Sequence, residues 1–362
     1  MLRSRREMLQ QTLLAFSAAT AGWAQSGRPL LRIGCLNVHN YSHLLDLWAP
    51  LMNPRDGKKE VAFTGMRITH CWEIQPERSA EFAKIYRCEA VRDFDDMLGK
   101  VDGIISGGYF NHGWNHILHA PYLQAGLPNL INRPFANSLA KARQMIDLAR
   151  KHNATILCPS AYEYTDATAR ALAWVKDKKI LSYDATNSFD DYPTHGVHGL
   201  YMIHRAIVEA GNPVVSVTFR GKNWYTPPGL MTFEHRDASG NPFLGTLHQT
   251  TGSWGTLQVH TKEHYGGKMF AIESGTGFPF STTEAWAPTL WAYERMARYR
   301  EMPQSFESLW DKTRLFMAGW RSILDGGKIV KLDEVPEDFE APVALPSRAS
   351  DPTVDLFKKK FG

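Results

Sequence analysis

The first half of the chain alternates short apolar runs with helical patterns, and this alternation restricts the fold more than any other feature of the sequence. The apolar runs cover residues 31–36, 67–71, 103–106, 129–131 and 155–158. Helical patterns follow at 76–86, 115–124 and 138–151, the last with its apolar residues on one stripe. Alternation of this kind predicts a parallel, doubly wound sheet, in which ligands gather at the carboxyl ends of the strands.

The second half differs because strand-like runs follow one another directly. A short helix at 199–210 precedes runs at 213–220, 230–235, 245–250, 255–260 and 268–274, and helices at about 283–300 and 306–326 come after them. Connections of hairpin length predict an antiparallel sheet. We therefore expect an α/β protein with a Rossmann-like domain over 29–160, an α+β domain with an open, mainly antiparallel sheet over 161–335, and a tail over 336–362.

The start of the chain has the features of an export signal. Residues 1–24 combine a cationic beginning, a modest apolar stretch and the small-residue string Gly22-Trp23-Ala24. Arg5 and Arg6 belong to a string similar to the twin-arginine signal, which carries folded proteins. We expect a removed signal peptide and a periplasmic or secreted protein, with an ordinary secretory leader or an uncleaved anchor as the alternatives. No later apolar run is long enough to span a membrane.

The charge of the chain argues against nucleic acid as a partner. The formal net charge is +4 over 362 residues, and Arg3, Arg5, Arg6 and Glu7 of the leader supply a net +2 of it. The remainder is nearly balanced and contains no basic run that could neutralise a phosphate backbone. A chain of this length with 43% hydrophobic residues can form two domains with separate cores.

Three strings, in order along the chain, carry a resemblance to a known family. They are Asp-Gly-Ile-Ile at 102–105 with Ala-Gly-Leu-Pro-Asn-Leu-Ile-Asn-Arg-Pro at 125–134, Thr-His-Gly-Val-His at 194–198, and residues 307–310 with 322–330. They resemble three features of the Gfo/Idh/MocA family. The first looks like the family's aspartate–strand, AGKPV strand and EKP motif, the second like its catalytic DxxxH, and the third like its closing helix and strand. The resemblance implies a Rossmann fold that binds NAD or NADP, and oxidation or reduction of sugars or polyols.

The nucleotide site expected from this resemblance is altered. Of the glycines that let the backbone approach a pyrophosphate, Gly34 is present, whereas Leu36 and His39 take the other places. Glu73 stands where the family keeps its acid for the ribose hydroxyls. The resemblance therefore implies Gly34, Glu73 and Asn132 as cofactor residues in a degenerate NAD(P) site.

The residues expected to carry the chemistry are altered as well. Arg133 replaces the lysine of the EKP motif, and arginine stays protonated, so it can clamp a carboxylate but is a poor proton shuttle. Thr194 replaces the aspartate of DxxxH and leaves His198 without that partner. His195 and His198 are nevertheless the strongest candidates for acid–base residues, because histidine titrates in the required range.

Further polar and aromatic residues complete the predicted site. A divalent metal could be held by imidazoles near carboxylates, and the candidates are His43, His116, His195 and His198. The predicted substrate residues are Arg133, Tyr162, Asp184, Trp224 and His260, because aromatic faces and polar edges suit sugar rings. Tyr164 is the predicted phenolic acid.

Three functions fit these residues. The first is an exported saccharide-active lyase without net redox chemistry, in which a histidine base, Arg133 as a clamp and Tyr164 as the acid perform β-elimination on a uronic-acid-containing carbohydrate. Hydrolysis is left open. The second is an NAD(P)-dependent sugar oxidoreductase, or an oxidation-assisted glycosidase, with His198 as the base. The third is a carbohydrate-binding protein without catalysis. In each case the resemblance implies a homo-oligomer formed through the second sheet.

Overall fold

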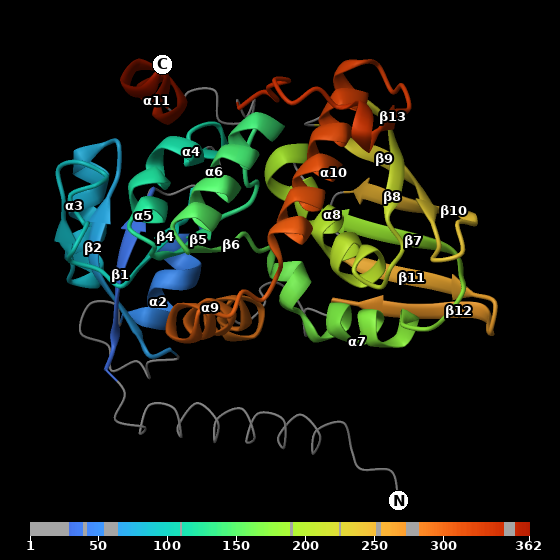
Figure 1. Ribbon diagram of the computed structural model, residues 1–362, viewed down its shortest axis with the longest axis horizontal. Coiled ribbons are helices and arrows are strands. Elements are labelled where there is room, and N and C mark those ends of the chain that lie inside the picture. The colour runs from blue at the N-terminus through green and yellow to red at the C-terminus, as the bar shows by residue number, and fades with distance from the viewer. Residues whose placement is uncertain are drawn as a thin grey trace, which may run out of the picture.

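The computed structural model describes residues 29–38, 42–53, 64–108, 111–188, 191–223, 226–250, 255–272, 282–343 and 352–362. The predicted signal peptide, His39 and Trp224 lie outside these described residues. The chain forms two sheets, with the helices α6 (Leu139–Lys151) and α10 (Phe306–Leu324) between them (Figure 1). This arrangement confirms the predicted α/β class.

The first sheet has six parallel strands in the order β3-β2-β1-β4-β5-β6. Their bounds are Glu89–Ala90, Met66–Trp72, Leu31–Leu36, Gly103–Ser106, Pro128–Ile131 and Thr155–Leu157 in that order. The strands β4, β5 and β6 are buried along their whole length, as expected for a parallel sheet covered on both faces. The strand order reverses between β1 and β4, which is the place where such sheets bind ligands.

Helices from both ends of the chain cover this sheet. The first half supplies η1 (Leu44–Trp48), α2 (Ala49–Met52), α3 (Pro76–Tyr86), the 3₁₀ turn η2 (Asn111–Gly113), α4 (Asn115–Leu118) and α5 (Ala120–Gln124). Helix α9 (Thr282–Tyr299) returns from the second half, and its Tyr293 hydroxyl lies 3.0 Å from the carbonyl oxygen of Ile104 and 3.1 Å from that of Pro128. The first core is thus completed by a segment remote in sequence.

The second sheet is mixed, with seven strands in the order β12-β11-β7-β10-β9-β8-β13. Their bounds are His264–Ala271, Thr256–Thr261, Ile180–Ser188, Pro242–Thr250, Thr226–Arg236, Val214–Asn223 and Val330–Lys331 in that order. The sequence patterns predicted five of these strands and missed β7, while the closing strand implied by the resemblance at 322–330 corresponds to β13. Strand β7 pairs parallel with β10 and antiparallel with β11, so it joins the hairpins into one sheet.

One face of the second sheet packs on helices and the other is open. Inward side chains such as Tyr183, Ala185 and Leu247 are buried in one core with residues of α8 (Val197–Ile203), the turn η5 (His204–Val208) and α10. Helix α7 (Asp166–Val175) covers β12 at the sheet edge, and the short turn η6 (Leu332–Glu334) follows β13. No helix among the described residues is long and apolar enough to cross a bilayer.

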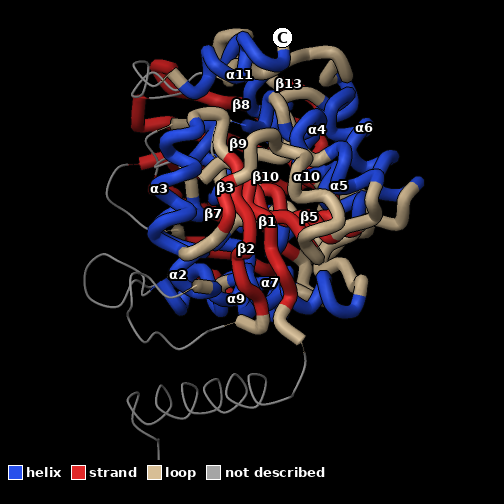
Figure 2. The backbone as a smooth tube through the Cα atoms, turned by 90° about the vertical axis from the view of Figure 1, so that its left-hand side faces the viewer, coloured by secondary structure: helices blue, strands red, loops and turns tan. Residues whose placement is uncertain are grey.

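The end of the chain forms a helix, α11 (Thr353–Phe361), in what the sequence indicated only as a tail. It lies above the first sheet, over the carboxyl ends of β1 and β2, as the two perpendicular views show (Figures 1 and 2). Phe357 of α11 belongs to the same apolar cluster as Leu36 and Trp72, the last residues of those two strands. The C-terminus therefore covers part of the predicted ligand edge.

Candidate active site

Polar side chains from three strand ends of the first sheet meet one helix of the second domain. His43 follows β1, Asn132 and Arg133 follow β5, and Ser160 follows β6. His198 reaches them from α8. Since parallel strands present their carboxyl ends at one edge, the meeting point is the edge at which the sequence predicted ligand binding.

Arg133 and His198 form the buried centre of this group. The Arg133 Nη2 donates to His198 Nε2 at 2.7 Å, and His198 Nδ1 lies 2.7 Å from the Ser160 hydroxyl. Arginine has no acceptor, so Nε2 has to accept and Nδ1 carries the hydrogen. Burial, followed by the charges of Arg133 and His195, lowers the pKa of His198 well below 6.5. His198 is therefore a neutral acceptor that holds Arg133, which differs from the predicted role of catalytic base.

Arg133 is fixed on its other side by Asn132. Its Nη1 donates to Asn132 Oδ1 at 3.2 Å, and Asn132 Nδ2 donates to the carbonyl oxygen of Gly107 at 2.8 Å. Arg133 has only 1% of its surface exposed, so its charge acts in a largely dehydrated environment. The pKa of the neighbouring His43 is lowered mainly by the burial of His43 and, second, by the charge of Arg133.

A second unit, Asp191, Thr194 and His195, lies in the turn before α8. Asp191 accepts from the backbone nitrogen and the hydroxyl of Thr194 at 2.6–2.7 Å, and His195 Nδ1 lies 2.9 Å from that hydroxyl and 3.5 Å from Asp191 Oδ2. Burial alone would raise the pKa of Asp191. The hydrogen bond and charge of His195, together with the hydrogen bonds from Thr194, outweigh this effect, so the pKa of Asp191 is lowered. His195 is 31% exposed, so a substrate can reach it.

The acid of this unit was missed by the sequence interpretation. Thr194 was assigned to the aspartate position of DxxxH because His198 was assigned to the histidine position. The same spacing is present three residues earlier, from Asp191 to His195. The structure brings that pair together in the π-helical turn η4 (Tyr192–Gly196), which Asp191 caps.

Aromatic rings surround the buried histidines. The Tyr162 ring stacks on His198 with centroids 4.9 Å apart, and His43 lies 4.4 Å from Trp286 and 5.2 Å from Trp48. Burial raises the pKa of the Tyr162 phenol. These rings exclude water from Arg133 and keep both histidines neutral.

A buried ion pair supports the turn that carries Ser160 and Tyr162, which is η3 (Ala161–Tyr164). Lys312 Nζ lies 2.8 Å from Glu163 Oε1, and the other oxygen of Glu163 accepts from the Ser160 backbone nitrogen at 2.8 Å. The ammonium group also donates to the carbonyl oxygen of Cys158 at 3.1 Å and lies 4.3 Å from the Tyr201 ring centroid. Lys312 of α10 thus fixes, through Glu163, the position of Ser160, which is hydrogen-bonded to His198.

Several predicted residues lie away from this group. Tyr164 packs beside the core of the first domain, because in a short 3₁₀ turn it points to a different side from Tyr162. His116 lies on α4, where burial and the charge of Lys141 lower its pKa to about 4. Among the described residues no group of three or more His, Cys, Asp or Glu side chains is arranged to hold a metal, so the predicted metal site has no support.

Asp184 and His260 were predicted to bind substrate, but they lie on the open face of the second sheet. His260 Nε2 is 3.8 Å from Asp184 Oδ2, and Asp184 also accepts from the Thr246 hydroxyl at 2.7 Å. The residue next to Asp184, Tyr183, points inward, so strand alternation places Asp184 outward. The sequence patterns did not identify β7, so they gave no indication of the face on which Asp184 lies.

The turn after β1 differs from the predicted glycine site. Gly34 lies inside β1, where a Cβ atom would stand 2.7 Å from Ile104 Cδ1 and 2.8 Å from Met97 Sδ, so a larger residue there would displace the ends of these two side chains. The left-handed residue at the strand end is Asn37, with φ 59°. Asparagine tolerates this conformation but adds a side chain where a pyrophosphate would need open backbone.

The remaining predicted cofactor residues, Glu73 and Asn132, are both buried. Glu73, at the end of β2, is 2% exposed and its Oε1 accepts from the Ile74 backbone nitrogen at 2.8 Å. Thr353 of α11 accepts hydrogen bonds from Gln75 and Arg78, which follow Glu73 in the sequence. While α11 stays in this position, the residues present do not fit the adenosine half of a dinucleotide.

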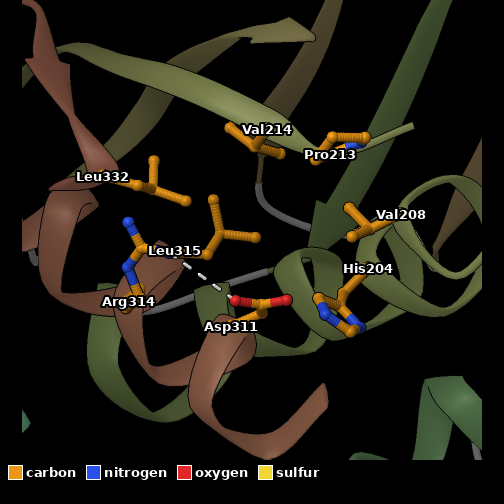
Figure 3. A pocket seen from close by; sticks show the side chains of 8 residues that line it. All are labelled: His204, Val208, Pro213, Val214, Asp311, Arg314, Leu315 and Leu332. Carbon is orange, nitrogen blue, oxygen red and sulfur yellow. Dashed lines mark ion pairs between the residues drawn. The ribbon is translucent and has the colours of Figure 1, made fainter. Parts of the chain in front are cut away.

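A separate surface pocket lies at the junction of α10, η5 and β8 (Figure 3). Its lining residues are His204, Val208, Pro213, Val214, Asp311, Arg314, Leu315 and Leu332. The Asp311–Arg314 ion pair, at 3.7 Å, crosses it. It shares no residue with the group around Arg133, and we assign it no part in the chemistry.

Comparisons with known proteins agree with this architecture. Residues 46–159 match the GFO_IDH_MocA model, described as an oxidoreductase family with an NAD-binding Rossmann fold. No curated protein matches the chain in sequence. Similar solved structures include a scyllo-inositol dehydrogenase from Lactobacillus casei, with a TM-score of 0.69 and 12% identity over 84% of this chain and 99% of that one.

Two further structures have the same fold. A myo-inositol dehydrogenase from Lactobacillus casei, solved with NAD(H) and myo-inositol, has a TM-score of 0.67 and 12% identity over 83% of this chain and 96% of that one. A probable dehydrogenase from Thermotoga maritima has a TM-score of 0.66 and 14% identity over 84% of this chain and 100% of that one. The similarity covers both domains.

Proposed function

Because residues 46–159 match the model of the Gfo/Idh/MocA oxidoreductase family, we propose that the chain oxidises or reduces a hydroxyl-bearing carbon of a sugar or cyclic polyol, with His195 as the acid–base residue. The observation that carries this proposal is the Asp191–Thr194–His195 unit, accessible at the ligand edge. Two solved neighbours are inositol dehydrogenases, which supports a cyclic polyol or sugar as the substrate class.

His195 would transfer the proton of the reacting hydroxyl. Its Nδ1 is engaged with Thr194 and Asp191, so Nε2 is the nitrogen that receives the proton. The ionised Asp191 stabilises the resulting imidazolium and fixes the orientation of the ring. Positioned proton transfer of this kind contributes roughly 10²–10⁴-fold to the rate.

The charge of Arg133 would stabilise the substrate oxygen that gains negative charge. Its guanidinium is held by His198 and Asn132, so the charge is oriented before substrate arrives. Oxidation of the hydroxyl also requires a hydride acceptor of the nicotinamide class. The fold provides a crevice for it, but α11 has to leave that crevice first.

One observation favours β-elimination on a uronide as the second candidate. Arginine takes the place of the lysine in the EKP-like string, and a permanently charged guanidinium suits a sugar carboxylate. In that reaction His195 would remove the proton next to the carboxylate, the electron pair left behind would form the new C=C bond, and the bond to the leaving oxygen would break as that oxygen takes up a proton from the His195 imidazolium or from water. No hydride acceptor is needed.

Product analysis separates the two reactions. The purified protein is incubated with inositols, hexoses and uronide oligosaccharides, each with and without NAD⁺ or NADP⁺. We expect a keto product together with reduced nicotinamide, dependent on His195. Unsaturated uronides formed without nucleotide would instead establish the lyase, and binding of sugars without any product would establish a non-catalytic role.

We further propose that the chain is exported, since its first residues resemble a twin-arginine signal. Fusion of residues 1–28 to a reporter that is active only after export of a folded domain tests this. Replacement of Arg5 and Arg6 by lysine should abolish the reporter signal. A signal that survives this change would contradict the twin-arginine route.

A further inference from the structure

The C-terminal helix α11 makes specific contacts with the crevice at the ends of β1 and β2. Phe357 is 1% exposed, its ring stacks on Trp114 with centroids 5.0 Å apart and 27° between the planes, and it meets Trp72 edge-on at 6.2 Å. The cluster around it includes Leu36 at the end of β1 and Ile104 of β4. An aromatic side chain of α11 is therefore buried in an apolar cluster beside the point where the strand order reverses.

Polar contacts accompany this ring. The Thr353 hydroxyl accepts from Gln75 Nε2 at 2.9 Å and is 3.4 Å from Arg78 Nη1. Both donors follow Glu73, the residue that in a dinucleotide fold lies at the ribose. At the other end of the helix, Lys360 Nζ pairs with Asp93 at 3.3 Å.

These contacts have the chemistry that an adenosine would need. A purine ring stacks on aromatic side chains as a phenyl ring does, and a ribose hydroxyl can take the donors that Thr353 takes. We propose that α11 occupies the adenosine subsite of this Rossmann fold, so that the helix and an adenine nucleotide exclude each other. The inference rests on the nucleotide-binding fold and not on the assignment of His195.

The consequence is a chain whose nucleotide affinity depends on the position of α11. A tethered helix has a high effective concentration at its own site. The apparent affinity for nucleotide is the affinity of the open crevice multiplied by the fraction of molecules in which the crevice is open. Displacement of α11 therefore raises the affinity without any change in the crevice itself.

Calorimetric titration with ADP and with NAD⁺ tests this exclusion. Three full-length proteins are compared: the unchanged chain, the double variant Thr353→Ala with Phe357→Ala, and the control Lys359→Ala, which alters an exposed residue of the same helix. A fourth sample carries a protease site in place of residues 344–350 and is cut after folding. Circular dichroism and thermal melting check that each protein is folded.

We expect the dissociation constant for ADP to be at least tenfold lower in the double variant and in the cut protein than in the unchanged chain. The Lys359→Ala variant should have the same dissociation constant as the unchanged chain. A peptide of residues 352–362 should compete with ADP for the cut protein. Equal ADP affinity in the unchanged and cut proteins would overturn the proposal, and so would the absence of ADP binding in a folded, cut protein. A His195→Asn variant should bind ADP like its parent, which separates failure here from failure of the proposed catalysis.

Discussion

At the scale of single residues, two neighbouring histidines of one string have different environments. His198 is buried, neutral and bonded to Arg133, whereas His195 is accessible and bonded to Asp191 through its Nδ1 side. A residue whose accepting nitrogen is occupied by a guanidinium is unsuited to take a proton from substrate. The environments of these two histidines, and not their residue type, therefore support the proposed assignment of His198 as the positioning residue and His195 as the acid–base residue.

Replacement of Arg133 by lysine tests the clamp. Lysine has a single charged nitrogen and cannot hold His198 and Asn132 together as the planar guanidinium does. We expect KM to rise by about tenfold, which corresponds to about 1.4 kcal/mol of lost binding, with a smaller effect on kcat. Steady-state kinetics measures both constants, and an unchanged KM would contradict the role of Arg133 in substrate binding.

Lys312 should be important for stability. Lys312→Met leaves the buried carboxylate of Glu163 without its cation, and breaking such a pair costs roughly 3–5 kcal/mol. Denaturant unfolding measures this loss. The double variant Lys312→Met with Glu163→Gln should recover part of it, because no charge is then left unpaired. A single variant as stable as the parent would show that the pair does not support η3.

At the scale of elements, buried histidines link stability to pH. Burial lowers the pKa of His119 and His235 to about 4, and lowers those of His43, His198 and His204 well below 6.5. The unfolded chain binds protons near pH 6.5 while the folded chain does not. Stability is therefore fully present above about pH 6.5 and is lost as the pH falls from there towards the folded-state values.

The expected size of this effect is about 1.4 kcal/mol per pH unit for each such histidine, until its folded-state pKa is reached. Denaturant unfolding between pH 7.5 and about pH 4.5 measures it. Substitution of His235 by glutamine should reduce the slope, because His235 has its Nδ1 on the Asn212 carbonyl and its Nε2 on the Tyr183 hydroxyl. Constant stability over this range would contradict the neutral state of the histidines.

Helices and strands with a clear hydrophobic pattern in the sequence were predictable, whereas those that depend on tertiary contacts were not. The apolar runs at 31–36 and 103–106 coincide with β1 and β4, and the pattern at 76–86 coincides with α3. Strand β7 was missed because Asp184, Thr186 and Asn187 give it a polar composition that only its central position in the sheet makes stable. Helix α11 is short, and its sequence does not show which surface it covers.

The candidate site was predicted in part for similar reasons. Asn132, Arg133 and His198 follow from motif positions and the geometry of parallel strand ends, whereas Ser160 and Lys312 give no motif signal. Tyr162 and Tyr164 are two residues apart, and only the 3₁₀ turn determines which one faces His198. Asp191 could have been found from its spacing to His195.

At the scale of the whole molecule, the open face of the second sheet is the surface on which we propose that a second copy binds. Leu244 and Met269 are 61% and 62% exposed there. Strand pairing places Asp184 opposite Thr246 and Gln258, and Met269 opposite Gln258, so these four side chains share one face. Leu244 is two residues from Thr246 on β10 and therefore lies on the same face as Met269. Exposed apolar residues on a broad sheet are typical of subunit contacts.

Charge on this face should prevent assembly. The double variant Leu244→Lys with Met269→Lys is expected to be smaller in solution than the unchanged chain, with the same thermal stability of each subunit. Light scattering after size-exclusion chromatography measures the mass. Leu324→Lys, at an exposed residue of α10, is the control. An unchanged chain that is already monomeric would contradict the proposed interface.

The most direct test of the central proposal is the turnover of His195→Asn on the best polyol or sugar substrate. We predict a loss of about 10²–10⁴-fold in kcat/KM, as expected for removal of a positioned acid–base group. Melting temperature and substrate binding should stay as in the unchanged chain, and the control His260→Asn, on the open face of the second sheet, should keep full activity. Full turnover by His195→Asn would contradict the assignment of His195 as the acid–base residue.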